Sequence, residues 1–462
     1  MFAIPGILGI LFFVYLRPQE AIEQLQGIPF LYLFFGLMLF GAAVDLRLRV
    51  TKAIAIPGLP WAVLFVVWSL FSVAIMKPDQ IMMLMIELFI TVGIFVLIAQ
   101  SIQTFRMFEV VASMLIALAL ILTGIAIHQG LSPQQCVVAP KGGGSAAAEA
   151  GVPDGRFCVK AWTCYDEDSE PGADYYCEKV GVLGTHSVSN RVRYRGILQD
   201  PNELAIALSS GLALLLALWI RSRRRFWAVM AFVGIIGVGW AVKMTGSRSG
   251  QLGFLAACVA FLYWKYGNKL AAVLGPLMIP LLLIVAKGGS DRGDADESSV
   301  ERYEAWRTGF DMFRGSPIWG VGYGQFNDYH FLTAHNTYVL VVAELGIVGI
   351  FIFSMLLWTS MKTPITALKR FKGHPEAKVA ELWSVALLAS MIAILSGCMF
   401  LSFAYHQILW IFLGMAGALY ICIKRHDPEF EVKIGFIDYV VVFGVDIFLF
   451  FGLQLYLKSK GH

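Results

Sequence analysis

Long apolar runs recur along this 462-residue chain and constrain its fold more than any other feature. A helix of about 20 apolar residues is long enough to cross a bilayer. Since 58% of the residues are hydrophobic and only 15% are charged, the composition is also far from that of a soluble globular protein. The sequence therefore predicts an all-α, polytopic transmembrane helical bundle. We expect 12 or 13 spans, from apolar runs at residues 2–16, 28–45, 54–76, 79–100, 104–128, 201–220, 226–244, 250–266, 268–286, 336–359, 379–402, 405–424 and 435–457.

Two long hydrophilic segments interrupt these runs and divide the chain into five regions. The last run carries Asp438, Asp446 and Gln454 at eight-residue spacing, so the sequence leaves open whether it is a full span. The expected regions are N-terminal spans in 1–128, a cysteine-containing loop in 129–200, central spans in 201–286, a second loop with a short amphipathic helix in 287–335, and C-terminal spans in 336–462.

The distribution of basic residues predicts the orientation of the chain. Lys and Arg accumulate in short cytoplasmic loops of membrane proteins. If the spans alternate, the clusters at 47–52, 221–225, 362–378 and 424–425 all fall on one side. The N-terminus is then cytoplasmic, and both long hydrophilic loops lie outside.

Four of the seven cysteines lie together in the first outer loop, at positions 136, 158, 164 and 177. Clustered cysteines in an oxidising compartment indicate disulfides, and four cysteines allow three pairings that the sequence does not separate. A zinc site is the alternative, although CxxC pairs and a local pair of histidines are lacking. The candidate disulfide residues are Cys136, Cys158, Cys164 and Cys177.

Several function classes find no support in the sequence. The chain lacks a P-loop, an HExxH motif and a GxSxG motif, so we expect no metal ion and no cofactor. The net charge of +4 gives no reason to expect nucleic-acid binding. We see no internal repeat of the kind that many transporters contain, and most charge lies in loops. A solute or lipid transporter nevertheless stays open as an alternative of another class.

The segment from 298 to 349 is polar and rich in aromatic residues, and it is where we expect the chemistry. Ser298 and Glu301 have the spacing of a capping box, which predicts a helix start at Ser298. Gly315, followed closely by proline, predicts the end of that helix. The alternating glycines of GVGYG at 320–324 permit close approach of the backbone to a ligand.

Arginines in the expected outer segments oppose the usual charge bias and need a reason. Guanidinium groups suit bidentate capture of phosphate oxygens, which suggests a phosphate-bearing lipid substrate. The alternative is that they pair with acidic residues of the same loops, and for the residue in the TGSRSG turn a structural role at the helix ends is also possible. The arginines are Arg191, Arg193, Arg195, Arg248, Arg302 and Arg307.

His335 precedes an apolar run and is our candidate for general base chemistry. A neutral imidazole can accept the proton of an attacking sugar hydroxyl. The alternative is an interfacial histidine bonded to a backbone carbonyl. Glu344, inside the following span, is either functional or an interhelical hydrogen-bonded contact. Asp200 and Pro201 read as an N-cap and first turn, and the positive end of that helix could face an anionic group.

Three motifs in this order resemble the bacterial O-antigen ligase and polymerase superfamily of membrane glycosyltransferases. They are RGILQDPNELA, the TGSRSG turn, and RYEAW followed by GSPIWGVGYGQF and HNTYVLVVAELGIVG, which together cover roughly residues 190–350. The regions on either side are similar to the family only as generic membrane spans. The cysteine-rich segment before the first motif departs from the family pattern.

The resemblance implies an inverting, metal-independent glycosyltransferase that moves a glycan from undecaprenyl diphosphate to an acceptor hydroxyl, with lipid A-core as the favoured acceptor. It implies a multi-pass protein of the bacterial inner membrane whose active site faces the periplasm. A polymerase that extends the lipid-linked glycan and a ligase that glycosylates protein share the donor site and remain open.

By the same resemblance, Arg195, Arg248 and Arg302 would bind the diphosphate, and His335 would activate the acceptor hydroxyl. A diphosphate leaving group that is neutralised by arginines needs no acid catalyst. The secondary candidates are Arg191, Arg193, Arg307, Asn336, Glu344 and Gly322.

Overall fold

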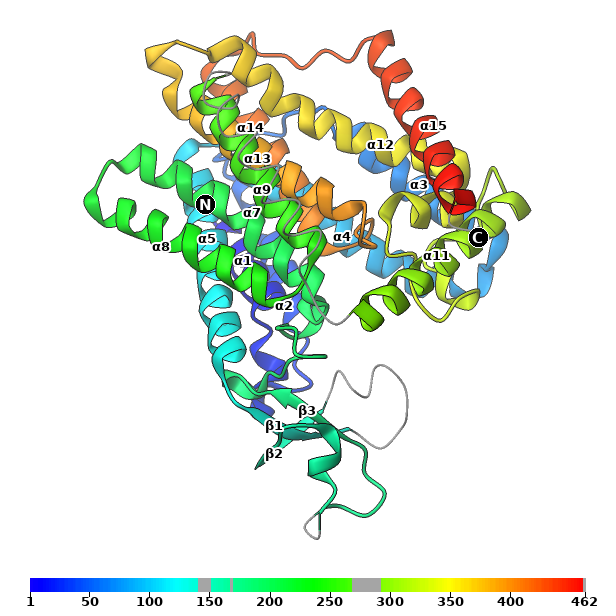
Figure 1. Cartoon of the computed structure of the whole chain (residues 1–462). Helices are drawn as coiled ribbons and strands as arrows, with labels where there is room; N and C mark the ends of the chain where they lie inside the picture. The colour runs from blue at the N-terminus through cyan, green and yellow to red at the C-terminus, as the bar shows by residue number, and fades with distance from the viewer. Residues whose placement is uncertain (140–150, 167–168, 268–291, 460–462) are drawn as a thin grey trace.

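The computed structural model describes residues 1–139, 151–166, 169–267 and 292–459, and it is built almost entirely of helices (Figure 1). Within these ranges, ten helices are long and apolar enough to cross a membrane. The chain is therefore a polytopic helical membrane protein, as predicted. The ten helices are α2 (Phe30–Arg47), α3 (Leu59–Met76), α4 (Ile81–Ser101), α5 (Phe105–Leu131), α7 (Pro201–Ser222), α8 (Arg225–Met244), α12 (Thr337–Phe371), α13 (Lys378–Cys398), α14 (Gln407–His426) and α15 (Phe436–Ser459).

Two further helices coincide with predicted spans. Helix α1 (Ala3–Tyr15) has 13 residues, which is short for a span. Helix α9 (Arg248–Tyr266) has 19 residues but begins with an arginine and carries a lysine in its last turn. The predicted run at 268–286 lies outside the described residues. Every other predicted span coincides with a helix.

The buried core of the bundle is formed by α7, α13 and α14. Helix α13 packs against α7 and α9, and α14 packs against α4. In α7 and α14, 83% and 89% of the most apolar window is buried, against 11% in α15. Most of the surface of α15 is therefore exposed, whereas α7, whose first residue follows Asp200, is buried in the middle of the bundle.

Helix α12 is longer than its apolar run and is interrupted near its start. It continues to Phe371, twelve residues beyond the predicted end, and its backbone breaks at Gly346, where φ is 67°. A Cβ on Gly346 would lie 2.2 Å from the carbonyl oxygen of Ile318. The amide of Ile347 donates a 2.9 Å hydrogen bond to the carbonyl of Pro317. The break therefore lets the 315–335 connection pack directly on α12.

The first long hydrophilic loop folds into a small sheet, which the sequence did not predict. Strands β1 (Gln134–Val138), β2 (Val152–Phe157) and β3 (Tyr175–Lys179) pair antiparallel in the order β2-β1-β3. Figure 1 shows this sheet beyond one end of the helical bundle, where α5 leads into it.

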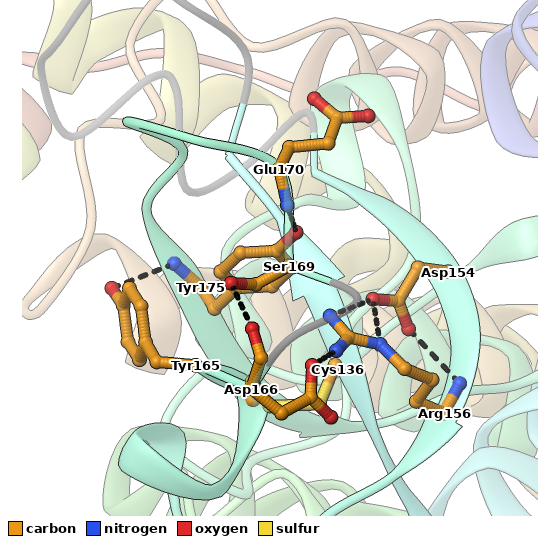
Figure 2. Close-up of polar contacts among 9 residues, drawn as sticks. Cys136, Asp154, Arg156, Tyr165, Asp166, Ser169, Glu170 and Tyr175 are labelled. Atoms are coloured by element: carbon orange, nitrogen blue, oxygen red, sulfur yellow. Dashed lines mark hydrogen bonds and ion pairs between the residues drawn. A yellow bond between two sulfur atoms is a disulfide. The ribbon is translucent and has the colours of Figure 1, made fainter.

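Two disulfides fasten the sheet to its own connections. Cys136 is bonded to Cys164, and Cys158 is bonded to Cys177. Figure 2 shows Arg156 between the carboxylates of Asp154 and Asp166, with which it forms ion pairs. The disulfide prediction is thus confirmed, and one of the three possible pairings is selected.

The helix of the second loop, α11 (Arg292–Gly315), differs from its prediction at one end. It ends at Gly315 as predicted but begins six residues before Ser298, so the capping-box assignment of its start is wrong. At 24 residues it is also not short. The predicted start of α11 at Ser298 is wrong because a Ser-x-x-Glu spacing fits the interior of a helix as well as its first turn.

Candidate functional site

Three connections that are distant in sequence meet at one end of the bundle. The first is the end of the 190–200 segment, where Asp200 caps α7. Its Oδ1 accepts a 2.8 Å hydrogen bond from the amide of Asn202, and Pro201 occupies the first turn. This start of α7 was predicted. The second connection is the turn before Arg248, and the third carries His335.

Asp200 lies close enough to Arg302 and His335 to influence the titration of both. The nearby carboxylate of Asp200 raises the pKa of both Arg302 and His335, whereas burial, the larger effect, lowers both. Arg248 lowers the pKa of Arg302, and Arg302 lowers that of His335. The structure therefore brings together three of the residues singled out from sequence: Arg302 and His335 lie near the carboxylate of Asp200, and Arg248 lies near Arg302.

Arg248 lies at the first position of α9, in a turn closed by its neighbours. The hydroxyl of Ser247 accepts a 2.9 Å hydrogen bond from the amide of Gly250 and lies 3.1 Å from the hydroxyl of Ser249. These serines cap the helix without the arginine. Arg248 itself is exposed and, among the described residues, its side chain has no hydrogen bond or ion pair. Its guanidinium is therefore available to an anion.

Arg302 projects from α11, and one turn later Trp306 fixes this helix against the His335 connection. The indole Nε1 of Trp306 donates a 2.8 Å hydrogen bond to the carbonyl of Ala334. Burial lowers the pKa of Arg302, whose group nevertheless stays cationic at neutral pH. Within the described chain its guanidinium also has no hydrogen-bond or ion-pair partner. A poorly hydrated cation without a partner favours the binding of an anion.

His335 occupies a left-handed backbone conformation, with φ of 44°. Such a conformation is unusual outside glycine and often occurs at functional sites. The next residue, Asn336, caps α12: its Oδ1 accepts from the amides of Tyr338 and Val339, and its Nδ2 donates a 3.0 Å hydrogen bond to the carbonyl of Met399. Asn336 therefore has a structural role that holds His335 in place.

Glu344 fastens the GVGYG turn to α12. Its carboxylate oxygens accept hydrogen bonds from the amide of Gly324 at 3.0 Å, the amide of Phe326 at 2.9 Å and the hydroxyl of Tyr405 at 2.7 Å. Of the two interpretations that the sequence left open, these contacts match the hydrogen-bonded one. The side chain is only 2% exposed and is engaged by three donors, so it positions the turn.

The glycines of the turn are required by the backbone. Gly320 and Gly322 have φ of 69° and 109°. A Cβ on Gly320 would lie 2.2 Å from the backbone of Glu344. The amide of Gly322 donates a 3.0 Å hydrogen bond to the carbonyl of Glu344. We had expected these glycines to permit close approach to a ligand, and the close approach in this structure is to α12.

The other arginine candidates lie apart from this group or on its edge. Arg191 donates a 2.8 Å hydrogen bond to the carbonyl of Thr245. It lies at the edge of the cluster, because the charges of Asp200 and Arg302 influence its pKa. Arg193 is buried and bonded to His186. Arg195 donates to the carbonyls of Glu20 and Leu183. Arg307 is exposed on α11.

The connection at 399–406 contributes contacts that sequence reasoning did not anticipate. Besides Tyr405, it provides the carbonyl of Leu401, which accepts a 2.6 Å hydrogen bond from Thr337. His406 lies 3.1 Å from the carbonyl of Ile197, and burial lowers its pKa to about 4. No local pattern signals these contacts, because each joins segments more than 60 residues apart.

A comparison with known families identifies the central part of this site. Residues 238–354 match the family model described as O-Antigen ligase. Over this segment the chain is similar to the O-antigen ligase and polymerase superfamily. The match supports the resemblance and contains the TGSRSG turn and the stretch from RYEAW to HNTYVLVVAELGIVG, whereas RGILQDPNELA precedes it. The matched residues include Arg248, Arg302, His335 and Glu344, whereas Asp200 and Arg195 precede them.

The match to this family indicates a ligase-type or polymerase-type enzyme that acts on lipid-linked glycans. No curated protein matches the chain.

Proposed function

We propose that this protein is an O-antigen ligase-like glycosyltransferase that transfers a glycan from undecaprenyl diphosphate to an acceptor hydroxyl, with lipid A-core as the favoured acceptor. The observation that carries the proposal is the cluster in which Arg302 and His335 lie near Asp200 and Arg248 lies near Arg302. Two guanidinium groups without a hydrogen-bond or ion-pair partner among the described residues suit a diphosphate, and a neutral histidine beside them suits an attacking hydroxyl.

The reaction uses these groups in one displacement. Nitrogen of His335 accepts the hydroxyl proton while the acceptor oxygen forms a bond to the anomeric carbon. The bond from that carbon to the diphosphate oxygen breaks, and the electron pair leaves with the diphosphate. Arg248 and Arg302 stabilise the charge that develops on the leaving group, so the step needs neither an acid catalyst nor a metal ion. Attack opposite the leaving group inverts the anomeric configuration.

Asp200 has a distinct task in this scheme. When His335 takes up a proton, the imidazole becomes a cation beside Arg302, which disfavours it. The carboxylate of Asp200 offsets that repulsion, since it raises the pKa of His335. Because Asp200 also caps α7, its position is fixed before substrate binds. We therefore assign Asp200 as a positioning residue that acts through His335.

Charge at the two ends of α7 supports a site on the periplasmic face of the inner membrane. Asp200 lies at one end of this buried helix, and the basic residues 221–225 follow its other end. Basic clusters favour the cytoplasm, so Asp200 and the residues around it face outward. We infer a cytoplasmic N-terminus from the same rule. The disulfides of the β1–β3 sheet suit an oxidising compartment.

A polymerase that extends the lipid-linked glycan is the second candidate, because it shares the donor half of the site. Deletion in the native host separates the two. A ligase deletion leaves polymer on its lipid carrier and lipid A-core without glycan. A polymerase deletion instead leaves core capped with a single repeat unit. Unchanged lipopolysaccharide and unchanged lipid-linked glycan would contradict both functions and favour a transporter or an unrelated glycan.

A further inference from the structure

The two disulfides of the β1–β3 sheet differ in their access to solvent. Cys136 and Cys164 are 1% and 0% exposed, so the bond between them is closed to a reagent in solution. Cys158 and Cys177 are only partly buried. Thiol–disulfide exchange requires a thiolate to reach a sulfur of the bond, so access limits its rate. A thiol in solution therefore reaches the Cys158–Cys177 bond and does not reach the other bond directly.

The accessible bond lies beside the buried one. The Sγ atoms of Cys158, Cys136 and Cys164 all lie within 4.8 Å of one another. When two reactive groups are held in contact, their reaction no longer depends on a diffusive encounter and is accelerated. Once Cys158 is a free thiolate, it can therefore attack the buried bond that a thiol in solution does not reach.

The fold also brings the remaining cysteines opposite each other. Cys136 of β1 is paired directly with Cys177 of β3 in the antiparallel register. Residues opposite each other in such a pair have Cα atoms about 4.5–5.5 Å apart, within the range of about 4.4–6.8 Å that a disulfide spans. A second pairing, Cys136 with Cys177 and Cys158 with Cys164, is therefore within reach of the same backbone.

We propose that the four cysteines form a thiol-exchange site, which a dithiol reductant opens at Cys158–Cys177. One thiolate of the dithiol attacks Sγ of Cys177, the bond to Cys158 breaks, and Cys158 leaves as a thiolate. The second thiol of the reductant then closes the reductant's own disulfide and frees Cys177. Two electrons have passed from the dithiol to the sheet at this point. The exchange needs no glycan and does not depend on the proposed transfer reaction.

The second step moves the break to the buried bond. The thiolate of Cys158 attacks Sγ of Cys164, the bond from Cys164 to Cys136 breaks, and Cys136 leaves as a thiolate, with no net change in oxidation state. The thiols of Cys136 and Cys177 now face each other across β1 and β3. The oxidised form of the reductant closes them into a disulfide and takes back two electrons and two protons. The dithiol therefore acts catalytically.

The two pairings hold the segment 158–164 differently. In the structure its first residue is bonded to β3 and its last residue is bonded to β1. After exchange its two ends are bonded to each other, and the segment has lost both cross-links to these strands. Trp162, whose side chain is 67% exposed, lies in this segment. The exchange site therefore controls how firmly an exposed aromatic side chain is held on the sheet.

Limited reduction of the purified full-length protein tests the site. The protein is treated without denaturant with substoichiometric dithiothreitol, free thiols are trapped with N-ethylmaleimide, and peptides are mapped without further reduction. We expect peptides that link Cys158 to Cys164 and Cys136 to Cys177, beside those of the original pairing. Trapped Cys158 and Cys177 with only the original Cys136–Cys164 bond would overturn the proposal.

A folded dithiol protein distinguishes two sources of the reductant. Reduced thioredoxin replaces dithiothreitol in the same experiment. Exchange that thioredoxin also drives assigns the partner as a protein dithiol, whereas exchange with dithiothreitol alone assigns it as a small thiol.

A variant supplies the attacking thiol without any reductant. Cys177→Ser leaves Cys158 free beside the buried bond. We expect N-ethylmaleimide to label both Cys158 and Cys136, and a peptide that links Cys158 to Cys164 to appear. Label on Cys158 alone would contradict the exchange.

The thiols outside the sheet are an internal control for both experiments. Cys258, Cys398 and Cys422 are free cysteines in helices of the bundle. We expect none of them to enter a cross-link. Cross-links to any of them would show unspecific scrambling in unfolded protein and would overturn the proposal.

Discussion

The indole nitrogen of Trp306 donates a 2.8 Å hydrogen bond to the carbonyl oxygen of Ala334, the residue before His335. This bond joins α11 to the connection that carries the proposed base. Because Arg302 lies one turn before Trp306, the same bond sets the position of a guanidinium relative to an imidazole. In the proposed mechanism, the same bond fixes the group that binds the leaving diphosphate to the group that activates the acceptor.

Removal of the imidazole should abolish most transfer without unfolding the protein. His335→Asn is the sharpest change, because asparagine tolerates the left-handed backbone at this position better than alanine does. We expect kcat to fall by about 10²–10⁴-fold, the usual contribution of a general base. Initial rates and thermal unfolding of the purified variant check this. Full activity at an unchanged melting temperature would remove His335 from the mechanism.

Replacement of Asp200 should shift the acid limb of the pH–rate profile. The base form of His335 is neutral, and burial lowers its pKa from the ordinary value of 6.5, so activity should persist as pH falls through that value. Asp200→Asn removes the carboxylate that raises this pKa but keeps an N-cap side chain. The acid limb of kcat should therefore move to still lower pH. A limb that stays in place would show that Asp200 acts only as a helix cap.

Loss of either Arg248 or Arg302 should weaken transition-state binding. Charge-assisted hydrogen bonds contribute about 1.5–3 kcal/mol, so Arg302→Ala and Arg248→Ala should each lower kcat/KM by about 10- to 150-fold. Arg302→Lys should recover only part of this, because an ammonium does not bind phosphate in a bidentate manner. Arg307→Ala, on the exposed face of the same helix, is the matched control. A loss in Arg307→Ala as large as in Arg302→Ala would contradict the assignment.

Local patterns were enough to predict the membrane fold and to single out Arg248, Arg302 and His335, which the structure brings together. Apolar runs of sufficient length located every described span, and Asp200 with Pro201 located the start of α7. The long-range contacts were not predictable in this way. Glu344 binds Tyr405 across 61 residues, and Trp306 reaches Ala334 across 28, through contacts that no spacing along the chain encodes. Arg195, ranked beside Arg248 from sequence, donates instead to two backbone carbonyls.

The turn at 320–324 should fail when a side chain is added at its first glycine. Gly320→Ala places a Cβ 2.2 Å from the backbone of Glu344, which cannot move without shifting α12. Gly373→Ala is a matched control, since its φ of 82° imposes a similar backbone strain with nothing within 4 Å of the new Cβ. We expect Gly320→Ala to lower thermal stability and transfer well below the control. Equal effects would show that backbone strain alone matters there.

Removal of the carboxylate of Glu344 should act on the same turn. Glu344→Gln keeps the shape but replaces one acceptor oxygen with an NH₂ group that faces other donors. Leaving buried donors unsatisfied costs about 1–3 kcal/mol, so the variant should unfold at lower temperature. Tyr405→Phe removes only one donor and should cost less. A Glu344→Gln protein with parental stability but no transfer would instead place this carboxyl in the chemistry.

The disulfide pairing can be tested directly, and its energetic role follows from the size of the sheet. Non-reducing peptide mapping should recover Cys136 linked to Cys164 and Cys158 linked to Cys177, with Cys258, Cys398 and Cys422 as free thiols.

Three short strands bury few apolar side chains, chiefly Ala173 and Tyr175 beside the cysteines, so the sheet depends on its cross-links. The pair of substitutions Cys158→Ala and Cys177→Ala should destabilise it by about 2–5 kcal/mol. Faster proteolysis within 151–179, with the helical bundle intact, would show that the sheet has lost stability. A different pairing in the peptide map would contradict the structure of the β1–β3 sheet.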